Sequence, residues 1–168
     1  KRHLPNTIFL CPDGHEQCSI NPSGYQWFDL TNDDPKYILV ESKKAEIKLR
    51  QYIEEIKKEY NLSNNQICIS GFSQGCMMSI NLGLTASSEF MCILGFSGKI
   101  INQEDLRLRK KSSTDTLLIH GDLDDIVSPT FLLEAKDFFI RNNINIETHL
   151  IKNCGHHIPI EASSIALN

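Results

Sequence analysis

The sequence predicts an α/β protein in which a mainly parallel β-sheet is flanked by helices. Short apolar runs rich in strand-forming residues alternate with longer segments of helical periodicity, a pattern typical of βαβ units. The chain has 168 residues, a length that suits one domain, so we expect residues 1–168 to form a single unit. Apolar residues make up 40% and charged residues 23%, ordinary values for a globular protein.

The first apolar run, residues 7–11, is rich in strand formers, and Pro12-Asp13-Gly14 ends it. We therefore expect a strand there. A polar stretch follows to about Asp34 and contains Trp27-Phe28-Asp29. It is predicted to be a long loop, and long loops in compact domains are often functional.

The clearest helix is predicted over residues 35–60. Apolar residues recur there at three- and four-residue steps and form one stripe: Ala45, Leu49, Ile53, Ile56 and Tyr60. Lys and Glu fill the other positions. The charged run 54–59 is therefore predicted to be the solvated face of this helix rather than a binding site.

The alternation of strands and helices continues to the end of the chain. The expected strands cover residues 66–70, 90–96, 116–120 and 145–151. Helices are expected after the segment 71–75, over about 129–142 and from 158 onward. Met77 and Met78 fall in the first of these helices, where flexible thioether side chains are expected to fill the core.

Charge and cysteine content exclude several classes of protein. The net charge of −4 predicts no general attraction to nucleic acid or to anionic membranes. Every apolar run is shorter than the ~20 residues needed to span a bilayer. The six cysteines form no C-x-x-C pair, so zinc-site spacing is absent, and reduced thiols in a cytoplasmic protein are expected.

The motif Gly71-x-Ser73-x-Gly75 follows a predicted strand and opens a predicted helix, the context in which such a serine becomes a nucleophile. We expect the glycines to permit a tight turn, because side chains there would crowd the neighbouring elements. The backbone N–H of Gln74 would then point toward a developing oxyanion. A second Gly-Phe-Ser segment ends at Ser97, but Lys99 replaces the last glycine, and we interpret it as a strand end.

A serine nucleophile needs a histidine base and a carboxylate that orients it. Three candidate acids follow the strand predicted at 116–120, namely Asp122, Asp124 and Asp125. Asp124 lies two residues before Ile126, where the loop turns back toward the chain. At least one of the three is expected to be an ordinary solvated residue.

Candidate bases follow the last predicted strand, in Gly155-His156-His157. A loop at this place can reach the same edge of the sheet as Ser73. The adjacent histidines and the acidic turn also allow a metal-site alternative, but neighbouring residues seldom point at one ion. The remaining histidines are interpreted as structural or surface residues: His3, His15, His120 and His149.

Together these segments resemble the phospholipase/carboxylesterase family of α/β-hydrolases, which includes acyl-protein thioesterases and small bacterial carboxylesterases. The matching segments occur in the family's order over nearly the whole chain. They are Trp27-Phe28-Asp29, Gly71-Phe72-Ser73-Gln74-Gly75, His120-Gly121-Asp122-x-Asp124 with Val127 and Pro129, and Gly155-His156. The resemblance implies the α/β-hydrolase fold and an esterase that needs no cofactor and no metal.

By this resemblance Ser73 is the nucleophile, Asp124 the acid and His156 the base. Gln74 supplies an oxyanion donor, and Trp27 and Phe28 belong to a possible substrate loop. The sequence departs from the family pattern in the acid loop and next to the base. Asp125 stands where proline is common, Ser128 is an additional residue, and His157 adjoins the base.

The resemblance also implies a His-Gly-rich loop with the second oxyanion donor, which would precede the first residue of this sequence. We therefore expect the fold to lack its N-terminal strands, about 40–50 residues by typical element lengths. The implied substrates are small apolar esters or thioesters, acylated proteins or lysophospholipids, with no nucleic acid, no stable membrane insertion and a possible homodimer. The alternative is a truncated, non-catalytic or weakly active remnant that serves as an interaction module.

Overall fold

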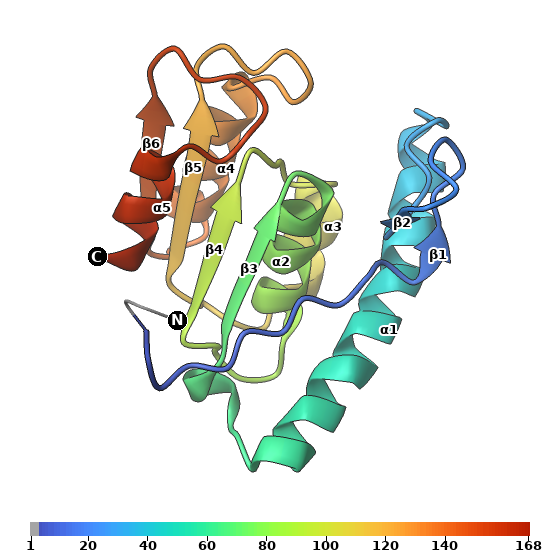
Figure 1. Ribbon diagram of the computed structural model, residues 1–168, viewed down its shortest axis with the longest axis vertical. Helices are drawn as coiled ribbons and strands as arrows, with labels where there is room; N and C mark the ends of the chain where they lie inside the picture. Colours follow the sequence, from blue (N-terminus) through green and yellow to red (C-terminus); the bar gives the residue numbers. More distant parts are fainter. Residues whose placement is uncertain (1–3) are drawn as a thin grey trace.

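A sheet of parallel strands, in the order β3-β4-β5-β6, forms the centre of the computed structural model, which describes residues 4–168 (Figure 1). The strands are β3 (Cys68–Phe72), β4 (Cys92–Phe96), β5 (Thr116–Gly121) and β6 (Ile146–Ile151). Every neighbouring pair is parallel, so all four carboxyl ends meet at one edge of the sheet. The predicted α/β class and parallel sheet are confirmed.

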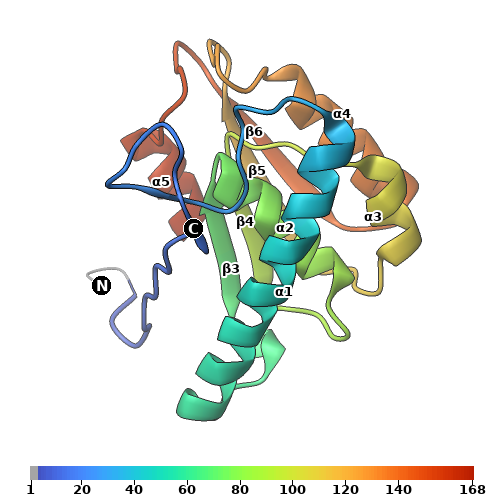
Figure 2. The same cartoon turned by 90° about the vertical axis from the view of Figure 1, so that its right-hand side faces the viewer.

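Helices cover both faces of this sheet unequally (Figures 1 and 2). The helices are α1 (Pro35–Tyr60), α2 (Gln74–Thr85), α3 (Gln103–Arg109), α4 (Thr130–Arg141) and α5 (Ile160–Leu167). A short 3-10 turn, η1 (Asn64–Gln66), precedes β3. Helices α2, α3 and α4 share one apolar cluster on one face, whereas α5 packs on the other face.

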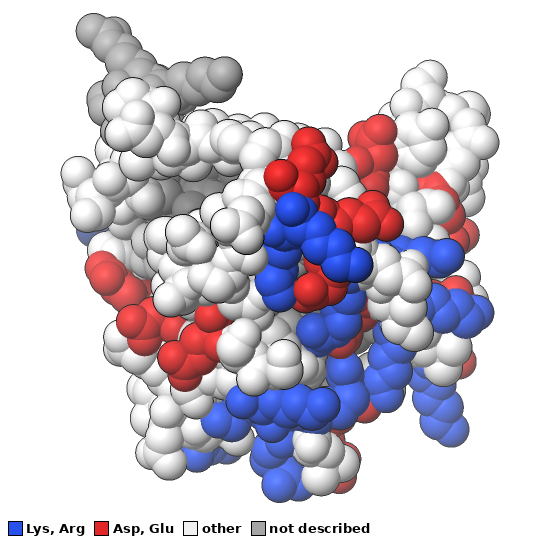
Figure 3. Space-filling view, turned by 90° about the horizontal axis from the view of Figure 1, so that it is seen from below, with Lys and Arg blue, Asp and Glu red and all other residues white. Residues whose placement is uncertain are grey.

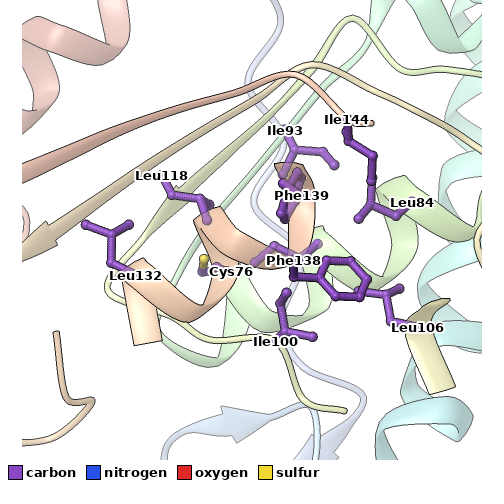
Figure 4. Packing of buried hydrophobic residues seen from close by; sticks show 12 residues of the cluster. Cys76, Leu84, Ile93, Ile100, Leu106, Leu118, Leu132, Phe138, Phe139 and Ile144 are labelled. Carbon is purple, nitrogen blue, oxygen red and sulfur yellow. The ribbon is translucent and has the colours of Figure 1, made fainter. Parts of the chain in front are cut away.

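The period-two alternation of the strands explains these two layers. In β5, Leu118 faces the cluster of α2 and α4, whereas Leu117 and Ile119 face α5. Figure 4 shows the larger cluster, in which Phe138 and Phe139 of α4 meet α2 and α3 side chains. Helices cover both faces of the inner strands β4 and β5, so the sequences of these strands are continuous apolar runs rather than alternating apolar and polar residues.

Helix α1 has the bounds that its apolar stripe predicts. The Asp34 side chain accepts the Lys36 N–H at the amino end, and Asn61 ends the helix in the left-handed region with φ 54°. Ala45 and Leu49 are buried against Met77 and other α2 side chains. The stripe thus packs α1 beside α2, near the β3 edge of the sheet (Figures 1 and 2).

The charged run of α1 lies on the surface, as predicted, where Lys57 pairs with Glu54. Figure 3 views the molecule from the end at which the strands begin, and there Lys and Arg side chains are interspersed with Asp and Glu. The face therefore carries both signs of charge rather than a uniformly basic surface. Such mixed pairs on a helix surface contribute little to stability, ~0.3–0.5 kcal/mol each.

Two predictions about secondary structure need correction, and one helix was not predicted. The strand expected over residues 7–11 is absent from the described chain, because the run finds no neighbouring strand and leaves Ile8 and Phe9 more than half exposed. The predicted long loop instead contains a two-residue ladder between β1 (Glu16–Gln17) and β2 (Tyr25–Gln26). Helix α3 was not predicted; the Asn102 side chain caps it by accepting the Asp105 N–H.

All six cysteines carry free thiols. Cys76 is buried beneath β4, as expected for a small apolar residue, but Cys11 is exposed in the strand-free segment. Cys68 and Cys92 are register partners on β3 and β4, with their sulfur atoms 3.2 Å apart.

Candidate active site

The turn between β3 and α2 presents Ser73 at the carboxyl edge of the sheet. Ser73 has φ 53° and ψ −116°, a conformation that L-residues rarely adopt and that costs ~1–3 kcal/mol. Its N–H donates to the Phe96 carbonyl of β4 at 2.8 Å, which fixes the turn to the sheet. The hydroxyl is thereby lifted out of the strand and placed at the start of a helix, as the motif predicts.

The two glycines of this turn have different roles. A Cβ on Gly71 would lie 2.2 Å from the carbonyl carbon and oxygen of Gly75, so only glycine allows this close approach. A Cβ on Gly75 would meet nothing within 4 Å. The expectation that both positions are crowded therefore holds for Gly71 and is wrong for Gly75.

The loop after β5 places one carboxylate inside the protein. The Asp124 side chain is completely buried, and its Oδ1 accepts the N–H groups of Ile126 at 3.0 Å and Val127 at 2.8 Å. Its Oδ2 lies 2.8 Å from Nδ1 of His156. Asp122 instead accepts the Cys154 N–H, and Asp125 is exposed. The structure thus brings Asp124, and neither rival, to His156.

The loop after β6 places His156 between the carboxylate and the serine. Its Nε2 lies 3.0 Å from Ser73 Oγ, and the Phe72 ring packs against the imidazole with 4.7 Å between ring centroids. His157 is exposed, and its ring approaches Cys154 rather than Ser73. The two adjacent imidazoles therefore diverge. Ser73, His156 and Asp124 follow β3, β6 and β5 and form one hydrogen-bonded chain.

Two opposing effects set the charge of the buried acid. Burial raises the pKa of Asp124, but the hydrogen bonds from the Val127 N–H, His156 and the Ile126 N–H outweigh it and hold the pKa below its ordinary value of 3.8. Asp124 is therefore a carboxylate at neutral pH. It fixes a proton on Nδ1 of His156, which leaves Nε2 as the acceptor facing the serine hydroxyl.

Gln74 uses its backbone and side chain differently. As the first residue of α2, its N–H has no acceptor within the helix. Its side-chain oxygen accepts the Trp27 N–H at 2.8 Å, and its side-chain nitrogen donates to the Phe28 carbonyl at 2.7 Å. This two-point contact ties residues 27–28 to the serine turn and was not predicted, because no sequence pattern marks it.

The predicted substrate loop needs one correction. The Phe28 side chain is fully buried in the cluster shared by α1 and α2, so it anchors the loop and lines no open cleft. Trp27 is half-buried against the same cluster.

The other histidines are accounted for in part. Within the described chain, His149 contacts Glu147 on the surface of β6, and His120 is buried beside Asp124. His3 lies outside the described residues. Across residues 4–168, no cluster of three or more His, Cys, Asp or Glu side chains is arranged to hold a metal ion. In the same range, no helix combines the length and apolarity needed to cross a bilayer.

A parallel sheet with a serine on a strand–turn–helix junction, followed in the chain by an aspartate and a histidine at the same edge, defines the α/β-hydrolase fold. A family model described as Phospholipase/Carboxylesterase matches residues 1–166. The chain therefore belongs to the phospholipase/carboxylesterase family, as its motifs predicted.

Similar proteins agree with this assignment. Acyl-protein thioesterase 1 of Yarrowia lipolytica is 27% identical over 183 residues, which cover 99% of this chain and 78% of that protein. Esterase YpfH of Escherichia coli is 23% identical and covers 98% of this chain and 69% of that protein. The crystal structure of esterase PE8 superposes with a TM-score of 0.94 at 32% identity, covering 99% of this chain and 78% of the other.

Proposed function

We propose that this protein is a serine hydrolase that cleaves carboxylic ester or thioester bonds of apolar acyl substrates. The observation that carries the proposal is the hydrogen-bonded chain from Ser73 through His156 to the buried Asp124. In this arrangement a weak nucleophile, its base and the group that orients the base are all within hydrogen-bond reach.

The proposed reaction has two halves. Ser73 Oγ attacks the acyl carbonyl while His156 Nε2 takes its proton, and Asp124 stabilises the resulting imidazolium. The Gln74 N–H donates to the oxyanion of the tetrahedral intermediate. His156 then returns the proton to the departing alcohol or thiol, which leaves an acyl-Ser73 ester. Water, activated by His156, hydrolyses this ester and releases the acid.

The surroundings of the site support an apolar acyl group. Leu123 and Ile126 flank Asp124 in the chain and are 62% and 70% exposed. Phe72 is one-third exposed and lies against the His156 ring. Exposed apolar side chains beside a catalytic group favour an apolar ligand. The thioesterase and esterase names of the relatives agree with this choice, and acylated proteins or lysophospholipids fit the same chemistry.

The free thiols add an inference about location. Six cysteines without a disulfide are typical of a reducing compartment, so we place the proposed activity in the cytoplasm.

The test combines turnover with covalent labelling. The wild-type protein should hydrolyse a short p-nitrophenyl ester and an acyl-thioester and should react with a fluorophosphonate probe. Mass spectrometry should locate the label on Ser73. The alternative function, a non-catalytic interaction module, predicts no label at Ser73 and no turnover above that of Ser73→Ala.

A further inference from the structure

His120 is a buried histidine that the proposed reaction does not use. It is the next-to-last residue of β5 and is 2% exposed. His120 lies among residues of β4, β6 and the loop after β6. The small void beside it is lined by Phe96, Cys154 and His157, among others. A buried polar ring of this kind needs a hydrogen-bond partner, because an unsatisfied one costs ~1–3 kcal/mol.

The hydrogen-bond partner of His120 lies in the loop after β5, residues 124–127, which contains Asp124. His120 Nε2 lies 2.8 Å from the Val127 carbonyl oxygen. A carbonyl oxygen only accepts hydrogen bonds, so Nε2 must carry the proton and donate. The same nitrogen lies 3.2 Å from Asp124 Oδ2, the oxygen that also faces His156.

Val127 is thereby held at both of its polar backbone groups. Its N–H donates to Asp124 Oδ1 and its carbonyl accepts from His120. The rest of this loop faces outward, since Asp125 is exposed and Ile126 is 70% exposed. The imidazole of His120 is therefore an inner anchor of residues 124–127, and the positive end of its N–H dipole lies next to the carboxylate.

We propose that His120 is a positioning residue of the reaction, which holds the Asp124 carboxylate against His156 through the Val127 carbonyl and its own N–H. This inference rests on the proposed function, because it assigns a role within that triad. The contacts of His120 are with the Val127 carbonyl and the Asp124 carboxylate, so it acts by fixing the acid that orients the base. Small displacements of such groups cost ~10²-fold in rate.

Matched variants separate the N–H donor from the ring. His120→Leu keeps similar volume and removes the donor. His120→Gln can place an amide N–H near the position of the imidazole Nε2, whereas His120→Asn has the same amide on a shorter side chain that cannot reach Val127. His149→Leu is the control for loss of a histidine, because His149 is half-buried on β6 and its ring pairs with the exposed Glu147, away from the Asp124 loop.

The first readout is turnover of the p-nitrophenyl ester. His120→Leu and His120→Asn should lower kcat by ~10²-fold with little change in KM, because the donor supports the base rather than the substrate. His120→Gln should keep most of the wild-type kcat, and His149→Leu should equal the wild type. If His120→Leu does not fold, the comparison of Asn with Gln gives the answer. Equal losses in Asn and Gln, or no loss in Leu, would overturn the proposal.

The second readout does not depend on turnover. The proton shared by His156 Nδ1 and the Asp124 carboxylate should give a low-field NMR resonance in the wild type. The resonance should persist in His120→Gln and broaden or shift in His120→Asn. An unchanged resonance in Asn would refute the positioning role. If the wild type neither labels at Ser73 nor turns over ester, the proposed function fails, while this resonance still decides whether His120 positions Asp124.

Discussion

Two identical tripeptides lie side by side in this sheet, and within the described residues only the serine of the first is hydrogen-bonded to a histidine ring. Gly71-Phe72-Ser73 of β3 and Gly95-Phe96-Ser97 of β4 are register partners over their first two residues. Both serines have positive φ, 53° and 48°. Each serine N–H donates to a carbonyl of the next strand, to Phe96 and Ile119 respectively.

The segment after each tripeptide makes the difference. After Ser73 the chain enters α2 at once, and His156 arrives from β6 at 3.0 Å from the hydroxyl. After Ser97 the chain continues through Gly98 and Lys99, and the serine is 2% exposed. The backbone conformation alone therefore does not define a nucleophile. In the proposed function, the start of α2 and the His156 ring from the loop after β6 make the difference.

Replacing each of the two serines by alanine should give the largest contrast in the rate of ester hydrolysis. Ser73→Ala should lower the rate of ester hydrolysis by ~10⁶-fold, because the whole triad acts through that hydroxyl. Ser97→Ala should keep most of the rate, because within the described chain the His156 ring is hydrogen-bonded to Ser73 and not to Ser97. The measurements are p-nitrophenyl ester hydrolysis and fluorophosphonate labelling. Labelling that survives in Ser73→Ala and is lost in Ser97→Ala would reverse the comparison.

The acid that serves the first serine can be tested in the same way. Asp124→Asn should lower kcat by ~10⁴-fold, because an amide stabilises the wrong tautomer of His156. Asp125→Asn should have little effect, since this side chain is exposed. Asp122→Asn should have little effect on kcat but should lower the stability of the fold, because the Asp122 carboxylate accepts the Cys154 N–H. A loss at Asp122 or Asp125 deeper than that at Asp124 would mean that another carboxylate orients the base.

The glycines that surround Ser73 give a smaller, structural contrast. Gly71→Ala should lower the free energy of unfolding by ~1–3 kcal/mol, because its Cβ would collide with the Gly75 carbonyl. Gly75→Ala should leave the fold intact or stabilise α2 by up to ~1 kcal/mol, because nothing lies near that Cβ. Urea unfolding measures both. Equal destabilisation would show that the close approach at Gly71 is not the reason for glycine there.

The smallest expected effect concerns pH. The fold lowers the pKa of Asp124 below 3.8, so the stability that this carboxylate contributes is present above that value and is lost as the pH falls through the lower, folded pKa. The difference in unfolding free energy between wild type and Asp124→Asn should therefore shrink below about pH 4. Urea titrations at several pH values measure it. A difference that grows on acidification would mean a raised pKa.

The sequence predicted most of the framework because its signals are local. The stripe on α1, the four β-type runs of the sheet and the strand–turn–helix context of Ser73 each depend on neighbouring residues. Helix α3 was missed because it has seven residues, mostly charged, and only Leu106 is buried. The run at residues 7–11 has strand composition, but a strand also needs a partner, and composition cannot supply one.

The site was predictable in its order and not in its contacts. The Ser, acid, His order restricted the choice to a few residues, and the resemblance selected Asp124 and His156 among them. The contact of Asp124 with His156 and the side-chain contact of Gln74 with residues 27–28 join segments far apart in the chain. Such contacts depend on tertiary packing and leave no pattern in a single sequence.

The span of the triad has a consequence for how activity appears during folding. His156 lies 83 residues after Ser73, and β6, which precedes it, is joined to β3 only through β5 and β4. Parallel pairing of distant strands is slow, because the chain loses the conformational entropy of large loops before the native contacts form. Reactivity toward a fluorophosphonate should therefore emerge late in refolding, after most of the helical far-ultraviolet circular dichroism has recovered. The nucleophile would remain inert until the last strand of the sheet is in place.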